Sequence, residues 1–260
     1  MIDIDVVRGY FPAAVRANAS FEKHILKEYL QLMILDFLSS SAYASRLSFI
    51  GGTCLRLVYG IDRFSEDLDF DCKDMTEEMF MKMTDDVMAY LRANDFSVEA
   101  RDKANPRLTA FRRNIYFPGL LFEMNMTGHR EERFLIKVEA QDQGVAYEPV
   151  VVDVKGCGFF FPLQSPPKGV LCAMKLAALL SRGKGRDFYD AMFLLSQTEP
   201  DYCFLNARCG VGTLEGLKAR MRELLSGVDL ERKAEDFKHL LFNIRGSGKI
   251  LRFGEFVDGL

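Results

Sequence analysis

The chain has 260 residues, of which 48% are hydrophobic and 27% charged, a balance typical of a globular protein with enough apolar material for a sizeable core. Its 34 Lys and Arg residues stand against 37 Asp and Glu residues, giving a net charge of -3. No overall basic charge therefore draws the chain to nucleic acid or to an anionic membrane, although a local basic patch is compatible with this balance.

The N-terminal segment does not predict export. Residues 1–10 alternate acidic and apolar side chains and lack the basic start and continuous apolar core of a signal peptide. Even the apolar segment 29–39 is interrupted by Gln31 and Asp36, so nothing approaches the roughly 20 apolar residues that span a bilayer. We therefore expect a cytoplasmic protein with no membrane partner.

Cysteine and histidine usage predicts neither a zinc site nor a disulfide framework. The six cysteines contain no C-x-x-C pair, and the three histidines lie far from one another in sequence. Buried free thiols are the simpler interpretation, because cysteine is among the most commonly buried residues.

The first part of the chain alternates between helical and strand periodicity. A helix following Ser20 begins the series, and Gly51 and Gly52 end a short strand before the next helix. Asp74 and Glu77 resemble a capping pair for a further helix. Helices are predicted over 20–39, 53–59 and 75–94. Strands, mostly antiparallel, are predicted over 47–50, 67–71, 96–100, 108–117, 121–127, 134–140, 150–154 and 159–161.

The sequence pattern changes from strands to helices at Pro166 and Pro167. Proline is tolerated in a first helical turn, and the residues that follow are apolar and rich in alanine. Helices are predicted over 168–181, 186–196, 214–225 and 230–241, with glycine breaks at 183–185 and 246–248. The sequence thus predicts an α+β fold. Residues 1–162 form a mixed or antiparallel sheet with flanking helices, and residues 163–260 form a mostly helical domain.

The strand at 67–71 alternates Asp with apolar residues, so Asp67, Asp69 and Asp71 share one face while Leu68 and Phe70 share the other. Like charges held together repel and raise each other's pKa unless a cation intervenes. Mg²⁺ is the natural cation, because it is bound by one or two protein carboxylates together with substrate phosphates and water. A solvated strand face is the alternative, and it suits Asp71 better than Asp67 and Asp69.

A glycine pair precedes these carboxylates. Gly51 and Gly52, followed by Thr53 at a helix start, would let backbone N–H groups approach phosphate oxygens. This signal is weak alone, since glycine turns more often serve only the backbone.

Two blocks of sequence make the interpretation specific. Residues 49–57 (FIGGTCLRL) and 63–70 (RFSEDLDF) resemble the G-G-T-x-L-R-L and R-F-S-E-D-L-D-F blocks of the AbiEii-type nucleotidyltransferases, in the same order and spacing. These toxins belong to the DNA polymerase β-like superfamily. Residues 175–179 and 182–190 resemble the family's K-x-x-A-L and R-x-K-x-R-D-x-Y-D blocks. The resemblance covers residues 21–196.

The resemblance implies roles for individual residues. Asp67 and Asp69 would hold Mg²⁺ or Mn²⁺, and the helical domain would complete the active site with Asp187, aided by Asp190. The residues expected to bind the NTP are Gly51, Gly52, Thr53, Arg63, Ser65, Lys175 and Arg186. A lysine amid apolar helix residues either extends to solvent or meets an anion, and the second block favours the anion for Lys175.

A third carboxylate from a neighbouring strand is also implied by the superfamily pattern. Glu139 is the candidate because strand alternation places it opposite Ile136 and Val138, while Glu123 competes for the role. A cross-strand ion pair is the alternative function for Glu139.

The expected reaction is transfer of a nucleoside monophosphate from an NTP to an acceptor. Acceptors such as tRNA 3′ ends have been proposed in the family, so the resemblance implies an RNA acceptor and a cognate antitoxin protein. Two alternatives stay open: a metal-dependent nuclease, since Lys137 and Glu139 loosely resemble such sites, and a catalytically inactive partner-binding protein of the same fold.

Overall fold

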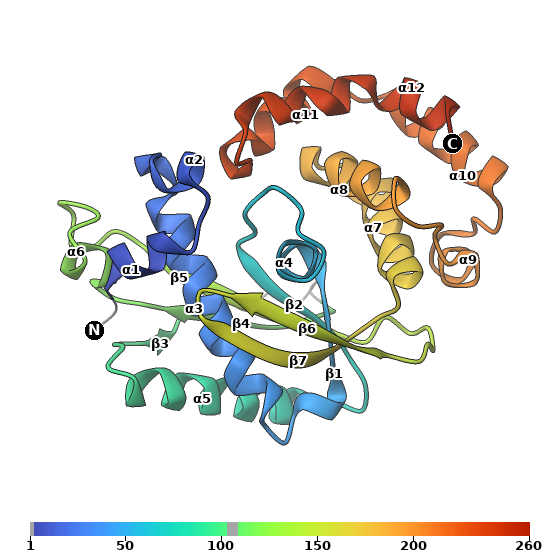
Figure 1. Cartoon of the computed structure of the whole chain (residues 1–260). Coiled ribbons are helices and arrows are strands. Elements are labelled where there is room, and N and C mark those ends of the chain that lie inside the picture. The colour runs from blue at the N-terminus through green and yellow to red at the C-terminus, as the bar shows by residue number, and fades with distance from the viewer. Residues whose placement is uncertain (1–2, 103–108) are drawn as a thin grey trace. The chain divides into compact units, whose positions relative to one another are not determined.

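The computed structural model describes residues 3–102 and 109–260, which divide into two units (Figure 1). The described residues of the first unit fall within Met1–Gly60, Phe64–Gln143 and Val150–Ser165. The second unit comprises Ile61–Arg63, Gly144–Pro149 and Pro166–Leu260. Each unit is therefore assembled from more than one stretch of sequence.

The first unit is built on a mixed five-stranded sheet with strand order β1-β2-β5-β4-β3. β2 and β5 are parallel, and the other neighbouring strands are antiparallel. A separate antiparallel hairpin, β6-β7, packs against β1 and the long helix α3. The strands are β1 (Leu47–Ile50), β2 (Asp67–Cys72), β3 (Glu99–Ala100), β4 (Phe111–Tyr116), β5 (Leu135–Gln141), β6 (Val150–Gly156) and β7 (Phe159–Ser165).

The alternation along β2 and β5 separates an apolar face of the sheet from a polar one. Leu68, Phe70, Ile136 and Val138 are buried, and α5 packs against β4 and α3 (Figure 1). Neighbouring residues of β2 and β5 present charged groups on the other face. The helices of this unit are α1 (Ile4–Gly9), α2 (Ala13–Arg16), α3 (Glu22–Ser39), α4 (Gly51–Leu57), α5 (Glu77–Ala93) and α6 (Leu120–Glu123).

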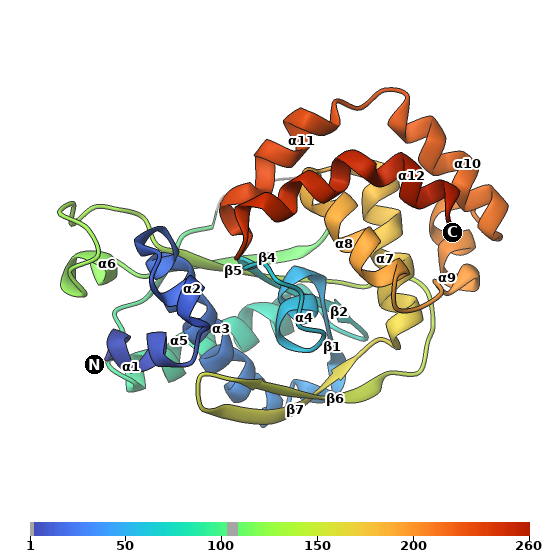
Figure 2. The same ribbon diagram turned by 45° about the horizontal axis from the view of Figure 1, so that its top comes forward.

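The second unit is helical. α7 packs on α8 and α9, and α8 in turn packs on α11, as the yellow to red helices of Figure 2 show. Its helices are α7 (Lys168–Arg182), α8 (Gly185–Leu195), α9 (Tyr202–Cys209), α10 (Leu214–Leu225), α11 (Leu230–Phe237) and α12 (Phe253–Asp258). The predicted α+β class, with a mixed sheet followed by a mostly helical part, is confirmed. None of the helices that the structure describes combines the length and apolarity that a membrane crossing requires.

Two predictions in the first unit are wrong. Residues 121–127 do not form a strand: Gly119 adopts a left-handed conformation (φ 71°) and α6 follows, because Glu123 N–H donates to Gly119 O at 2.9 Å. The helix after β2 is capped by Thr76, whose hydroxyl accepts from Met79 N, rather than by Asp74. The strand predicted over 108–117 begins at 111, and its first residue lies outside the described part of the chain.

Two further differences concern the second unit. α9 was not predicted, although Asp201 caps it by accepting from Phe204 N at 2.8 Å and Gly210 ends it in a left-handed conformation. The glycines at 246–248 do not interrupt helical structure as predicted, since they lie inside a 3₁₀ helix, η4 (Ile244–Arg252). Both segments are short, so their helices are defined by their caps rather than by their composition.

Candidate active site

Gly51 brings the end of β1 against a carboxylate of β2. Ile50 is opposite Asp69 in the antiparallel register, and the chain turns into α4 directly afterwards. Gly51 has φ +80°, and a Cβ placed there would lie 2.2 Å from Asp69 Oδ2. Only glycine therefore fits, both because of its left-handed conformation and because the Asp69 carboxylate occupies the space of a side chain.

The first turn of α4 is tied to the same strand. Thr53 Oγ1 donates to the backbone carbonyl of Asp67 at 2.5 Å, and both Gly52 and Thr53 are buried. The helix begins at Gly51 rather than at Thr53 as expected, so the glycine pair forms its first turn. The Thr53 hydroxyl fixes α4 to β2, and the position of the glycine turn relative to the carboxylates follows from it.

Asp67 and Asp69 lie half-buried on the polar face of β2, as alternation predicted. In the parallel register with β5, Lys137 is beside Asp67 and Glu139 is beside Asp69. Lys137 Nζ is 3.1 Å from Asp67 Oδ2 and 3.8 Å from Glu139 Oε1. The paired carboxylates are thus accompanied by an ammonium group, which offsets part of their mutual repulsion.

Asp71 differs from the other two aspartates of β2. It is buried, and Asp71 Oδ1 accepts a hydrogen bond from Gln143 N at 2.9 Å. The interpretation of Asp71 as part of a solvated strand face is therefore wrong. It holds the segment that leaves β5 and contributes to structure.

Glu139 has the cross-strand partner that the ion-pair alternative required. Arg112 is opposite Glu139 in the antiparallel β4–β5 register, and Arg112 Nε donates to Glu139 Oε1 at 2.6 Å. Glu123 lies on α6 rather than on a strand, so its placement on a neighbouring strand was wrong. Glu139 thus lies next to Asp69 with its carboxylate oriented by an arginine.

The donor set of this face fits one kind of metal. Among residues 3–102 and 109–260, no three His, Cys, Asp or Glu side chains are grouped closely enough to hold a metal ion by themselves. Asp67 and Asp69 supply two hard oxygen donors on one face, with backbone N–H groups of the glycine turn beside them. This arrangement fits Mg²⁺ that is completed by substrate phosphates and water, and it does not fit a closed protein cage.

In the second unit, Arg63, Lys175 and Asp190 form a buried ion cluster. Arg63 Nε and Nη2 donate to the two oxygens of Asp190 at 2.8 and 2.7 Å, and Lys175 Nζ donates to Asp190 Oδ2 at 2.9 Å. Burial would raise the pKa of Asp190, but the two cations outweigh it and lower the pKa to about 2. Asp190 therefore holds Arg63 and Lys175 together as one buried ion cluster.

Asp187 fixes the start of α8. Its carboxylate is buried, accepts from Arg182 Nε and Nη2 at 2.9 and 2.8 Å, and also accepts from Lys184 N at 3.1 Å. Half-buried Arg186 makes no ion pair with any residue that the structure describes. Asp187 thus satisfies backbone and side-chain donors at the start of its own helix.

The remaining residue of the first sequence block, Ser65, is buried in the first unit, where its carbonyl accepts from Gln31 Nε2 at 3.2 Å. The first unit thus brings together Gly51, Gly52, Thr53, Asp67, Asp69 and Glu139, and the second unit brings together Arg63, Lys175, Asp187, Asp190 and Arg186. Sequence analysis allowed a cross-strand ion pair for Glu139 but did not identify Arg112 or Lys137 as partners, because these pairings depend on the strand register.

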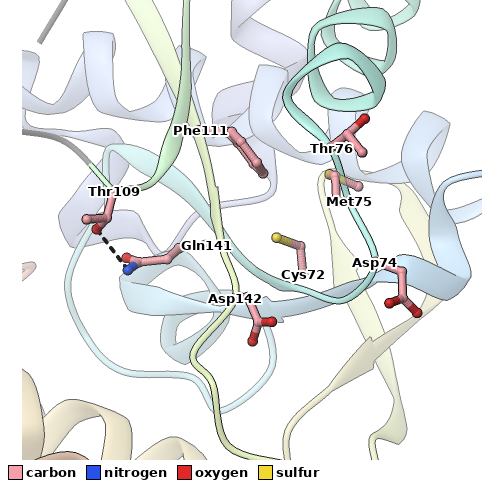
Figure 3. Close-up of a pocket in the computed structure, with 8 residues that line it drawn as sticks. All are labelled: Cys72, Asp74, Met75, Thr76, Thr109, Phe111, Gln141 and Asp142. Atoms are coloured by element: carbon pink, nitrogen blue, oxygen red, sulfur yellow. Dashed lines mark hydrogen bonds between the residues drawn. The ribbon is translucent and has the colours of Figure 1, made fainter. Parts of the chain in front are cut away.

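The first unit also contains a cavity away from these site residues. It has a volume of about 690 Å³ and lies where β2 and β5 end, at the opposite end of β2 from Asp67 (Figure 3). Gln141 donates to Thr109 at its wall, and burial together with Asp71 and Asp142 raises the pKa of the Cys72 thiol to about 11. None of the site residues expected from the sequence lines it.

A mixed sheet that holds paired aspartates against a glycine turn defines a nucleotidyltransferase fold. The sequence matches the family model described as "Nucleotidyl transferase AbiEii toxin, Type IV TA system" over residues 34–247, so the chain belongs to the AbiEii nucleotidyltransferase toxin family. It is accordingly a transferase, as the sequence resemblance implied. No curated protein matches the sequence.

Solved structures share the fold. MenT4, a nucleotidyltransferase toxin from Mycobacterium tuberculosis, is similar with a TM-score of 0.62 and 19% identity, over 100% of this chain and 91% of that one. JHP933 from Helicobacter pylori gives a TM-score of 0.55 and 20% identity over 91% of both chains. A putative nucleotidyltransferase from H. pylori gives 0.54 and 19% over 91% of this chain and 94% of that one.

Proposed function

We propose that this nucleotidyltransferase moves a nucleoside monophosphate from an NTP to an acceptor hydroxyl and releases pyrophosphate, with Mg²⁺ or Mn²⁺ as cofactor. The observation that supports it most is the Asp69 carboxylate lying in the space that a side chain at Gly51 would fill, with Asp67 on the same face of β2. A glycine turn with only a structural role needs no carboxylates beside it. Transfer of a phosphoryl group uses both features, the turn to contact phosphate oxygens and the carboxylates to bind the metal ion.

The residues of the first unit would hold the reacting groups. Asp67 and Asp69 would bind the metal ion, which when bound supplies charge neutralisation at the α-phosphate and at the leaving pyrophosphate. Backbone N–H groups of the Gly51–Thr53 turn would contact phosphate oxygens. Glu139, oriented by Arg112, is the proposed group that receives the proton of the acceptor hydroxyl.

The residues of the second unit divide into contacting and positioning groups. Lys175 and Arg186 are the proposed contacts to outer phosphates, since both match the basic positions of the family's second block and Arg186 forms no ion pair with the described residues. Arg63 and Asp187 were expected to touch the nucleotide or the reaction. Their burial and their saturated hydrogen bonds support positioning roles instead, with Arg63 holding Asp190 and Asp187 holding the start of α8.

The family also supports a biological setting. It is a family of toxins from type IV toxin-antitoxin systems, which implies a cognate antitoxin as partner. We infer further that the acceptor is RNA, such as a tRNA, and that the toxin acts in the cytoplasm. The net charge of -3 neither favours nor excludes RNA, so recognition would rest on local groups.

Incubation of the full chain with labelled NTPs, Mg²⁺ and total RNA tests the proposal. The expected result is pyrophosphate release and label on RNA, lost in EDTA and reduced by orders of magnitude in Asp69→Asn. Asp153→Asn is the matched control, because exposed Asp153 on β6 loses the same charge away from the site. Shortened RNA without NTP consumption would instead indicate a nuclease, and the absence of both products would indicate an inactive partner-binding protein.

A further inference from the structure

The second unit contains a small cavity whose walls combine aromatic and charged groups. Its volume is about 270 Å³, and it is lined by Asp62, Tyr189, Met192, Phe193, Ser196, Lys249 and Phe256. Tyr189, Met192 and Phe193 occupy one face of α8, because residues three and four apart on a helix are neighbours. Asp187 and Asp190, the two buried aspartates of α8 with structural partners, are not among the lining residues.

Two polar groups of this cavity keep hydrogen-bonding capacity. Asp62 Oδ1 accepts from the Tyr189 hydroxyl at 2.5 Å, and no described residue donates to Asp62 Oδ2. Lys249 Nζ lies 5.5 Å from the centre of the Tyr189 ring and, within the described residues, forms no ion pair. The Ser196 hydroxyl donates to the Phe193 carbonyl at 2.9 Å. The cavity therefore offers a carboxylate acceptor and an ammonium donor, both at its exposed rim, beside an apolar wall.

Size and chemistry together indicate what kind of group fits. Pockets for drug-sized ligands are about 300–1,000 Å³, so a cavity of about 270 Å³ suits a single ring system rather than a whole nucleotide. Planar bases are held in proteins by aromatic side chains at their faces and by hydrogen bonds at their edges. Phe193, Phe256 and Met192 supply the first kind of contact, and Asp62 and Lys249 supply the second.

We propose that this cavity binds a nucleobase that carries an exocyclic amino group. An amino group donates to Asp62 Oδ2, whereas a carbonyl at the same ring position would bring two acceptors together. Lys249 donates to a ring nitrogen or carbonyl of the same base. The assignment rests on the proposed function, because it is the nucleotidyltransferase reaction that brings nucleobases to this chain.

Free nucleosides test the cavity separately from the reaction, since they carry no phosphate and need no metal. Saturation-transfer NMR of the full chain in EDTA should show adenosine bound in preference to inosine, and cytidine in preference to uridine. Each pair differs by an amino group against a carbonyl. The expected preference is about tenfold, the effect of one hydrogen bond to a charged group.

Substitution of Asp62 should change the preference rather than abolish folding. In Asp62→Asn the amide oxygen still accepts from the Tyr189 hydroxyl, while the amide nitrogen becomes a donor. The amino preference should fall to about one or reverse. Lys249→Met should weaken all four nucleosides. Glu255→Gln is the charge-matched control, because Glu255 pairs with Arg252 at the surface and does not line the cavity.

The base has two sources, the incoming NTP and the end of an RNA acceptor. In transfer assays, Asp62→Asn raises the KM for the NTP if the cavity holds the incoming base, and raises the KM for RNA if it holds the acceptor base. The assignment is supported whenever the nucleoside preference depends on Asp62, even where no transfer is detected and the proposed function fails. It is overturned if no nucleoside binds, or if all four bind equally to wild type and Asp62→Asn.

Discussion

At the residue scale, two requirements for glycine at position 51 can be separated. Gly51 and Gly60 have φ +80° and +74°, but only at Gly51 would a Cβ meet another group, the Asp69 carboxylate at 2.2 Å. Gly60→Ala should therefore cost only the left-handed strain, about 1–2 kcal/mol, and keep full transfer activity. Gly51→Ala should carry the same strain and in addition lose transfer, because Asp69 must move.

Thermal melts compare the stability of the two variants, and pyrophosphate release compares their transfer activity. An active Gly51→Ala variant would contradict the assignment of Asp69 to the metal site, since that variant cannot keep the carboxylate where it lies now. An inactive Gly60→Ala variant would show instead that strain alone disturbs the site.

The buried ion cluster predicts unequal effects for its two cations. Arg63→Met removes two of the three hydrogen bonds to the Asp190 carboxylate, leaves only the one from Lys175, and should cost about 3–5 kcal/mol of unfolding free energy. Lys175→Met leaves the Arg63 pair intact and should cost less stability while raising the KM for NTP. Urea unfolding and steady-state kinetics measure these effects. An unchanged KM in Lys175→Met would remove Lys175 from the proposed phosphate contacts.

The proposed site was only partly accessible to sequence reasoning at this scale. The Asp alternation and the glycine pair are local patterns, so their positions on β2 and before α4 followed from spacing. The burial of Arg63 depends on Asp190, 127 residues further on, and no local pattern reports such a pairing. Lys137 beside Asp67 likewise depends on a strand register that spans 70 residues.

At the element scale, periodic segments were predicted better than short apolar ones. β1 over 47–50 and α10 over 214–225 agree with the expected ranges, because both have clear flanking signals. The run after Gly119 is apolar but short, so its helix and strand patterns cannot be told apart by period. The parallel pairing of β2 with β5 was unexpected among mostly antiparallel strands, since parallel neighbours need a long connection that local sequence does not reveal.

The contact of α8 with α11 predicts a second glycine requirement. A Cβ at Gly185 would lie 1.9 Å from the Lys233 carbonyl oxygen and 2.9 Å from Phe237 Cδ1. Gly185→Ala should therefore destabilise the chain by about 1–3 kcal/mol, as overpacking does, despite the better helix propensity of alanine. Gly254→Ala in α12 is the control, because the nearest atom, Leu225 Cδ1, is 3.8 Å away.

Chemical denaturation of the two alanine variants checks this prediction. Gly254→Ala should be neutral or stabilising by up to about 1 kcal/mol, since its helical position tolerates a methyl group. Equal stability of the two variants would mean that the α8 to α11 contact relaxes without cost.

At the scale of the whole molecule, the metal assignment predicts how stability responds to ligands. Asp69→Asn removes one of two neighbouring carboxylates, so in EDTA the variant should melt no lower than wild type. With Mg²⁺ and NTP, wild type should gain stability in proportion to site occupancy, and Asp69→Asn should lose most of that gain. Differential scanning calorimetry of wild type, Asp69→Asn and the Asp153→Asn control measures both effects.

The opposite pattern would identify Asp69 as a structural acid. In that case the Asn variant would melt several degrees lower in EDTA, reflecting about 1 kcal/mol or more, and would keep its activity. A destabilised but active variant is therefore the result that contradicts the metal site.

The interleaving of the two units has a consequence for biosynthesis. Residues 61–63 belong to the helical unit although both neighbouring segments belong to the first, and the counter-ion of Arg63 follows 127 residues later. At roughly 5–20 residues per second, a ribosome needs about 6–25 seconds to make that interval. Throughout it the arginine must stay hydrated, because burial without Asp190 would be costly. During its synthesis the chain therefore completes the ion cluster only late. A message truncated before codon 190 yields a chain in which Arg63 has no Asp190 to pair with.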